Sequence, residues 1–349
     1  MENDVTFHAV VTWIRNIFIP ANSVVGITGN FLALAVFTAS HQRHLSSSGY
    51  LGALACADNL FLITLFISWF DGIVPIMLTK EFCRFVIFTT YVSSFLSVWY
   101  VVCFTCERYI AICHPLKAPM ILAKVSEKTV VIVLAILASL MYSFAIWTTT
   151  VASFHGRNFC VPDQSYLDLM SFVTWVDTVI TMIVPFLMIA VMNIRIVYCV
   201  YLYQHKRRFI LQSHQSTPVK AKSQMKITKI LLLVSTTFLV LNLPSHAIRL
   251  ERIIVEKTDQ AVPLYKTLVQ ELAQYIYYAT FSVNFFLYAI YGKHFKKSLN
   301  IMLHGLCKRH TSRNKNPQWS YSEYNRTSMT SMNALRVTNG SISPHGSDV

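Results

Sequence analysis

The chain has 349 residues, of which 54% are hydrophobic and 13% charged, and its mean hydropathy is +0.46. Soluble domains carry roughly 25% charged residues, so this composition excludes an ordinary soluble protein of this length. The formal net charge of +14 comes with no nucleic-acid-binding motif. We therefore assign the positive charge to contact with lipid headgroups and expect no nucleic-acid partner.

The apolar residues are gathered into seven runs, each of about the 20 residues that cross a bilayer core as a helix. Several of these runs are apolar on nearly every face, as expected where lipid and neighbouring helices are both apolar. The sequence predicts an all-α membrane protein with one seven-transmembrane helix bundle over 17–291. The expected spans are 17–39, 49–72, 82–112, 129–152, 169–203, 226–250 and 264–291.

Basic residues predict the orientation of the bundle. If residues 1–16 form an extracellular N-terminus, the inner loops, inner helix ends and tail hold 22 of the 30 Lys and Arg residues, and 8 lie outside. Cytoplasmic segments of membrane proteins carry such an excess. No cleavable signal peptide is evident. We expect a multi-pass plasma-membrane protein with its N-terminus outside and its tail in the cytoplasm.

The third run ends in Glu107-Arg108-Tyr109, and Pro115-Leu116 follows shortly after. This string resembles the D/E-R-Y motif and second inner loop of rhodopsin-like (class A) G-protein-coupled receptors. The resemblance implies that Arg108 is held by its neighbouring carboxylate at rest and faces a heterotrimeric G protein when the receptor is active. It also implies that Leu116 packs into the Gα subunit, since Pro115 breaks the helix and presents it on a loop.

The resemblance covers about 17–305, and it implies a set of activation residues in the last two spans. These are Phe238, Asn242, Pro244, Asn284 and Tyr288. Lys293 to Leu303 resembles the family's amphipathic eighth helix, expected over 292–305 at the membrane surface.

Several positions depart from the family pattern, and three of them bear on activation. Asn242 replaces a tryptophan, Asn193 replaces a tyrosine, and Gln224 stands where an acid would pair with Arg108. We expect a weaker resting lock on Arg108 as a result.

The eight cysteines show no metal-like spacing. Cys83 and Cys160 fall in the oxidising outer compartment, and the family pattern implies a disulfide between them. Four others lie within spans, where we expect small packing residues: Cys56, Cys103, Cys106 and Cys199. Cys307 follows the amphipathic stretch and is a candidate for palmitoylation.

Asp58 lies near the middle of the second span, where a carboxylate is costly and usually functional. The resemblance supplies Ser97 and Asn284 as oxygen ligands that would hold an allosteric sodium ion with it. The alternative is a buried or protonated acid with no ion. No other cofactor is expected.

Two residues exclude two classes of ligand that other members of the resembled family bind. Thr90 stands where monoamine receptors carry an aspartate, and Tyr278 stands where opsins carry a lysine, so neither a monoamine nor retinal is expected. Apart from Asp58, the outer side has 11 acids against 8 basic residues. Such a balance predicts a mouth that suits a cationic ligand.

The residues expected around this mouth are Asp71, Thr90, Asp177, Arg249 and Glu271. The alternative is that each acid pairs locally with Lys80, Arg84, Arg157 or Arg249. We weigh local pairing slightly above ligand contact for any single acid.

Leu241-Asn242-Leu243-Pro244 and the Asn284–Tyr288 string resemble invertebrate neuropeptide receptors, most of all FMRFamide-like ones. We expect a receptor for a short peptide that has no enzyme activity of its own. The alternative is a seven-helix transporter or channel with Asp58 on the ion pathway. Transporters often show internal repeats, and the two halves of this chain show no self-similarity.

Residues 306–349 are rich in Ser, Thr and Asn, which predicts a disordered cytoplasmic tail. Its Ser/Thr clusters at 327–331 and 338–343 would, once phosphorylated, suit basic arrestin surfaces. The ending Ser347-Asp348-Val349 fits a PDZ-domain ligand. The alternative, which we weigh at least equally, is a C-terminus that no PDZ domain binds.

Overall fold

The computed structural model describes residues 2–39, 47–77, 79–154, 157–210, 219–255 and 264–312. The chain divides into two units, 1–299 and 300–349, and each is described by itself. The tail segments expected to meet kinases, arrestin and PDZ domains lie outside the described residues, as do the side chains of Gln224 and Cys307.

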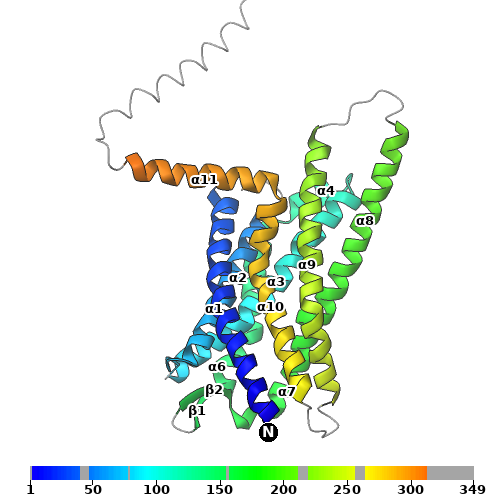
Figure 1. The fold of residues 1–349 in the computed structure, drawn as a ribbon. Coiled ribbons are helices and arrows are strands. Elements are labelled where there is room, and N and C mark those ends of the chain that lie inside the picture. The colour runs from blue at the N-terminus through cyan, green and yellow to red at the C-terminus, as the bar shows by residue number, and fades with distance from the viewer. Residues whose placement is uncertain are drawn as a thin grey trace, which may run out of the picture. The chain divides into compact units, whose positions relative to one another are not determined.

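The first unit is a bundle of long helices (Figure 1). In chain order it contains α1 (Glu2–Ala39), α2 (Ser48–Asp71), α3 (Lys80–Cys113), α4 (Ala118–Lys124), α5 (Glu127–Met141), α6 (Ala145–Thr148), α7 (Leu167–Thr178), α8 (Val184–Ile210), α9 (Val219–Val255), α10 (Leu264–Tyr291) and the start of α11 (Lys293–Ser312). A single two-stranded hairpin among the described residues joins α6 to α7; it consists of β1 (Thr149–Phe154) and β2 (Arg157–Pro162).

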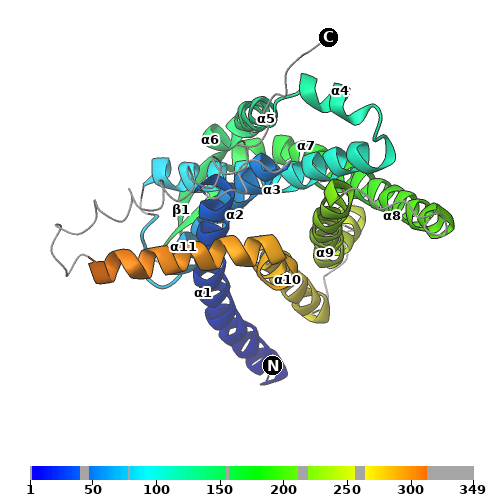
Figure 2. The ribbon, with the colours of Figure 1, turned by 90° about the horizontal axis from the view of Figure 1, so that it is seen from above.

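Six helical segments of the described chain are long and apolar enough to cross a membrane. They are Ala9–Thr38, Ser48–Asp71, Lys80–Cys113, Glu127–Thr148, Gln164–His205 and Thr228–Glu251. The seventh helix of the bundle, α10, is less apolar because it carries glutamines, tyrosines and two charged residues, and it packs against α1 and α9 (Figure 2). The predicted all-α membrane fold is confirmed.

Helix ends differ from the sequence expectation at several places. Helix α1 starts at Glu2, so most of the predicted extracellular segment 1–16 is helical. The fourth span ends at Thr148, where the chain becomes β1. Helix α11 continues to Ser312, so residues 306–312 are not part of a disordered tail. Its apolar residues Leu299, Met302, Leu303 and Leu306 keep helical spacing past the predicted end.

The fifth span is interrupted by a π-helical turn over Val179–Ile183 between α7 and α8. Pro185 is the second residue after this turn. A proline inside a helix lacks an N–H donor, and its ring clashes with the carbonyl four residues earlier. Widening the preceding turn relieves the clash, which explains why the sequence's continuous run 169–203 is divided in the structure.

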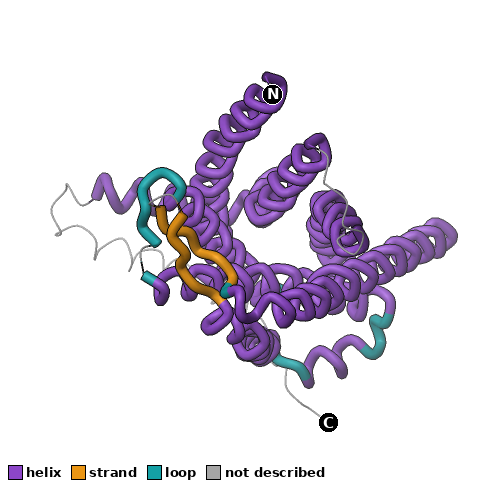
Figure 3. The backbone as a smooth tube through the Cα atoms, turned by 90° about the horizontal axis from the view of Figure 1, so that it is seen from below, coloured by secondary structure: helices purple, strands orange, loops and turns teal. Residues whose placement is uncertain are grey.

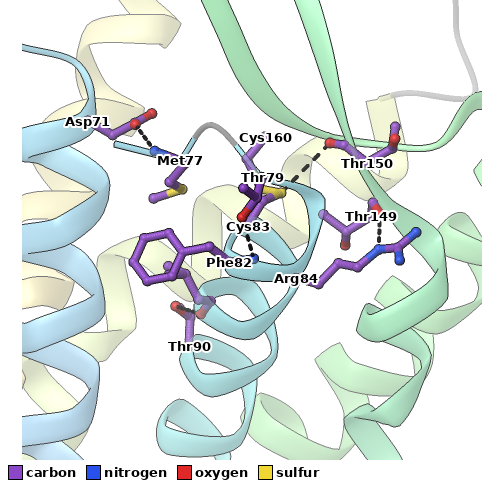
Figure 4. Close-up of a disulfide and its surroundings, with 11 residues drawn as sticks. Asp71, Met77, Thr79, Phe82, Cys83, Arg84, Thr90, Thr149, Thr150 and Cys160 are labelled. Atoms are coloured by element: carbon purple, nitrogen blue, oxygen red, sulfur yellow. Dashed lines mark hydrogen bonds between the residues drawn. A yellow bond between two sulfur atoms is a disulfide. The ribbon is translucent and has the colours of Figure 1, made fainter. Parts of the chain in front are cut away.

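We call the end of the bundle that carries the hairpin the hairpin end, and the end that carries α4 the α4 end (Figures 1 and 3). The hairpin is antiparallel and pairs Thr149 with Pro162 and Val151 with Cys160. A disulfide joins Cys160 to Cys83 at the start of α3, with the two Cα atoms 5.8 Å apart (Figure 4). The predicted bond is confirmed.

Polar contacts add to this attachment. Arg84 Nε donates to the carbonyl of Thr149 at 2.9 Å, so α3 holds the first strand of the hairpin as well as the second. Asp71 accepts the backbone N–H groups of Ile76 and Met77 at 2.8 and 2.7 Å and orders the loop before α3 (Figure 4).

A second disulfide joins Cys113 at the end of α3 to Cys199 of α8, with Cα atoms 5.7 Å apart. The expectation that Cys199 is a packing residue is wrong. The two cysteines lie 86 positions apart, and only the packing of α8 along α3 brings them together.

The core at the hairpin end is aromatic. Phe61 of α2 stacks on Phe281 of α10 with ring centroids 3.7 Å apart, and Tyr275 and Ile19 are buried in the same cluster. Gly26 of α1 permits this close packing, because a Cβ there would meet the side chains of the facing helices at 2.5 and 2.7 Å.

We expect Cys83→Ser, Cys160→Ser and the double variant to lose surface expression to the same extent. Each removes the same cross-link, and disulfides of this kind contribute about 2–4 kcal/mol to stability. Flow cytometry of an epitope-tagged receptor measures the loss, with Cys56→Ser, a free cysteine, as control. Normal surface levels and binding for Cys160→Ser would show that the bond is dispensable.

Candidate functional site

A cavity of about 1100 Å³ lies at the hairpin end, among α3, α7, α9 and α10. Pro162 of β2 forms part of its wall, so the disulfide-bonded hairpin borders it. Aromatic and hydroxyl side chains dominate the lining: Phe61, Thr90, Tyr91, Ser94, Tyr142, Ser171, Thr174, Trp175, Thr181, Ser245, Tyr277 and Tyr278. A largely apolar wall with a few convergent polar groups is typical of a ligand site.

The charged groups of this wall form an internal network. Arg249 Nη2 of α9 donates to Asp177 Oδ2 of α7 at 2.6 Å, and Tyr142 Oη donates to Asp177 Oδ1 at 2.6 Å. Asp177 is nearly buried, whereas the side chain of Arg249 is 36% exposed. The pair links the fifth and sixth spans at the hairpin end and leaves the wall close to neutral.

The structure brings three of the five expected ligand residues into the wall: Thr90, Asp177 and Arg249. Asp71 instead caps its own loop, and Glu271 lies outside the wall, which takes Gln270 and Gln274 from the same helix. The local pairing that we weighed above ligand contact is found for Asp177, and the wall of the cavity itself is not acidic. Helix periodicity turns Glu271 away from the wall, and the acid that remains there has an arginine partner.

Asp58 lies at the junction of α2, α3 and α10 and is fully buried. Its Oδ1 accepts Ser97 Oγ at 2.6 Å, and its Oδ2 accepts Asn284 Nδ2 at 2.8 Å. The two residues expected to share a cation with Asp58 thus contact it directly. The carboxylate and hydroxyl oxygens are ligands that suit a hard cation, whereas Asn284 presents its amide nitrogen to Asp58.

Two departures from the family pattern form hydrogen bonds between helices. Asn242 Nδ2 donates to the Phe238 carbonyl at 2.7 Å and to Thr280 Oγ1 of α10 at 3.4 Å. Asn193 of α8 accepts Ser235 Oγ of α9 at 2.9 Å. Sequence reasoning noted these replacements without predicting their partners. Pro244 lies inside α9, two residues after Asn242.

The end of α10 is held by aromatic contacts. The ring of Tyr288 packs edge-on against Phe37 of α1, with ring centroids 5.3 Å apart. Its centroid lies 5.7 Å from that of Phe295 in α11. Phe295 is buried, so the first turn of α11 is anchored to α1 and α10.

At the α4 end, Arg108 is almost completely buried. Its Nη2 donates to Glu107 Oε1 at 2.8 Å, as the resemblance implied. It also contacts Ser47, which sequence reasoning missed: Nε and Nη2 donate to Ser47 Oγ at 3.1 and 2.7 Å. Nothing in the local sequence indicates this contact across 61 positions.

Leu116 is 95% exposed on the turn that follows α3, an unusual position for a large apolar side chain. The turn begins where Pro115 ends the helix. Next to it, the rings of Tyr109 and His114 lie edge to face at 5.4 Å. Leu116 is therefore exposed at the α4 end, whereas the side chain of Arg108 is buried.

The family model of the 7 transmembrane receptor (rhodopsin family) matches residues 29–288. The chain belongs to this family. Among curated proteins, this rhodopsin-family receptor is 23% identical to the FMRFamide receptor of Drosophila melanogaster over 82% of the chain and 53% of the fly protein, so it spans about half the length of that relative.

Two other relatives have matches of similar strength. The somatostatin receptor type 1 of Rattus norvegicus is 23% identical over 80% of the chain and 69% of the relative. A neuromedin U receptor homolog of Caenorhabditis elegans is 24% identical over 79% of the chain and 75% of the relative.

We expect Arg249→Gln to lower the melting temperature of the solubilised receptor, because it leaves Asp177 without its cation. The free energy of unfolding should fall by about 1–3 kcal/mol. This is less than for a fully buried ion pair, because Arg249 is partly exposed. Tyr142→Phe should cost less, about 1 kcal/mol. The charge exchange Asp177→Arg with Arg249→Asp should recover part of the loss. Equal melting temperatures for wild type and Arg249→Gln would contradict a stabilising pair.

Proposed function

We propose that this rhodopsin-family receptor binds a short extracellular peptide at the hairpin end and activates a heterotrimeric G protein at the α4 end. The observation that carries the proposal is the placement of both features on α3. Thr90 and Tyr91 line the cavity, while Arg108 and the turn with Leu116 lie at the other end of the same helix. A ligand that shifts α3 against its neighbours would thus act on both ends.

The orientation in this proposal rests on charge. Basic clusters at 206–208 and 220–229 flank the loop between α8 and α9, and Lys117, Lys124 and Lys128 lie around α4. An excess of Lys and Arg is typical of the cytoplasmic side. We therefore place the α4 end in the cytoplasm and the N-terminus outside the plasma membrane.

The peptide ligand is supported by the relatives and by the cavity. The three relatives are an FMRFamide receptor, a somatostatin receptor and a neuromedin U receptor homolog. The cavity volume of about 1100 Å³ lies at the upper limit of ordinary small-molecule sites, and its rings offer faces for aromatic side chains. A cationic ligand group would have to compete with Arg249 for Asp177.

A library of amidated and free-acid neuropeptides, read out by calcium and cAMP in cells that express the receptor, tests the ligand class. We expect an active peptide that loses potency on Asp177→Asn or Arg249→Gln receptors. Activation by small non-peptide compounds alone would overturn the peptide assignment and leave the family intact.

Between the two ends, we propose that Phe238, Asn242, Pro244, Asn284 and Tyr288 change partners on activation. Their contacts join α9 to α10, α10 to α2 and α10 to α1, and a movement of α9 would break the first of these. The transporter alternative is not favoured, because the chain matches a receptor family and both Asp58 oxygens have protein partners.

The proposal includes further partners outside the described residues. Arrestin would recognise the phosphorylated Ser/Thr clusters, a PDZ domain the Val349 carboxylate, and the membrane a palmitoylated Cys307. Pull-down with phosphorylated, unmodified and glycine-extended tail peptides measures the first two, and metabolic labelling with a palmitate analogue measures the third.

We also propose that a sodium ion binds at Asp58 with Ser97 and Asn284. Asp58→Asn keeps the shape and removes the charge, so agonist affinity should lose its dependence on sodium while surface expression is retained. Affinity measured in sodium and in choline buffers tests this. A wild-type affinity that is the same in both buffers would remove the ion from the proposal.

We expect Arg108→Ala and Leu116→Asp to keep ligand binding and to reduce agonist-stimulated GTP exchange to the level of mock-transfected membranes. Arg108 supplies the buried charge and Leu116 the exposed apolar contact for the G protein. Met120→Asp, an acid at a nearby exposed apolar position of α4, is the matched control and should still couple. If binding and exchange fall together, these residues serve folding instead of coupling.

A further inference from the structure

The charged guanidinium of Arg108 is almost completely buried, and hydrogen bonds to neighbouring residues fix its position. Glu107 Oε1 contacts Nη2 at 2.8 Å, while Ser47 Oγ accepts from both Nε and Nη2. A hydroxyl that accepts two charge-assisted bonds fixes the guanidinium in one orientation. Ser47 is itself fully buried, at the boundary between the first loop and α2.

Ser47 adopts a backbone conformation that needs support. Its φ of 73° makes it the one non-glycine residue with positive φ in the described part of the chain. Left-handed residues other than glycine persist where the surrounding structure holds them, and they concentrate at switch sites. The carbonyl of Ser47 accepts the N–H of Leu51 at 3.1 Å and so starts α2.

The support comes from Glu127, the first residue of α5. Its Oε1 accepts the backbone N–H of Ser47 at 3.1 Å, and its Oε2 accepts the N–H of Gly49 at 2.8 Å. A Cβ at position 49 would collide with Glu127 Oε2, so glycine leaves room for the carboxylate. Glu127 thus fastens the start of α2 to α5, with the Ser47 hydroxyl directed at Arg108.

We propose that Ser47, held by Glu127, is a positioning residue that retains Arg108 in a resting orientation and releases it on activation. The proposal rests on the proposed role of Arg108 in coupling. It assigns the resting lock to the first loop and the fourth span, and so replaces the acid that Gln224 does not supply. The neutral hydroxyl makes the lock weaker than a second ion pair and therefore easier to release.

Ser47→Gly is the sharpest test, because glycine adopts positive φ without strain and removes the hydroxymethyl side chain that contacts Arg108. Ligand-free GTP exchange should rise at least about threefold at equal surface expression, as expected for a two-state equilibrium shifted toward the active state. Ser48→Ala is the matched control. It removes the adjacent buried hydroxyl, which bonds the Phe37 carbonyl at 3.3 Å and does not contact Arg108.

Glu127→Gln gives an independent test of the support. The amide NH₂ cannot accept the second backbone N–H, so basal exchange should rise here too. Combining it with Ser47→Gly should add little, because both changes release the same arginine. Adding Arg108→Ala to Ser47→Gly should return exchange to the mock level.

Basal exchange at or below wild type for Ser47→Gly, at equal expression, would overturn the lock. The lock would also be overturned if the higher basal exchange of Ser47→Gly persisted after Arg108→Ala was added, or if Ser48→Ala raised basal exchange equally. The assay needs no ligand, so it is separable from the peptide proposal. If a peptide activates the wild type but Ser47→Gly leaves basal GTP exchange unchanged, the lock alone is refuted. If Ser47→Gly raises basal exchange but no peptide in the library is active, the ligand class alone is refuted.

Discussion

The carboxylate of Asp58 is buried where α2, α3 and α10 meet, and its two oxygens take one hydrogen bond each from Ser97 and Asn284. Inside a bilayer-spanning bundle no water is at hand to replace such partners, so an unmatched polar group would be strongly destabilising. The register of the three helices is therefore constrained by one side chain. Helices that are otherwise apolar on most faces have few other means to specify that register.

The same constraint shapes both ends of the receptor. At the hairpin end, Asp177 enters the apolar wall with Arg249 and Tyr142 as partners. At the α4 end, Arg108 enters with Glu107 and Ser47. Each cluster joins at least two helices, so moving a helix requires charges to exchange partners. Buried polar clusters of this type suit a protein with two discrete arrangements, because intermediate positions leave groups unpaired.

The departures from the family pattern follow this logic. Asn193 and Asn242 replace large aromatic residues, yet each bonds a neighbouring helix through Ser235 or Thr280. Hydrogen bonds between membrane helices contribute about 1 kcal/mol each, enough to bias packing without locking it. Helix α9 is thus attached to α8 and α10 by modest polar contacts from Ser235 and Asn242, both of which precede Pro244.

The sequence by itself determined the membrane fold, the spans and the family resemblance, because each depends on local features: apolar length set by bilayer thickness, and short strings such as 107–116. It also placed Asp58 with Ser97 and Asn284, and Cys83 with Cys160, through that resemblance. Tertiary structure alone decided the π turn before Pro185, the hairpin, the pairing of Cys113 with Cys199, the neutral cavity wall and the contact of Ser47 with Arg108. These depend on which faces of distant helices meet, and lipid-facing and bundle-facing residues are equally apolar, so periodicity carries no signal for that choice.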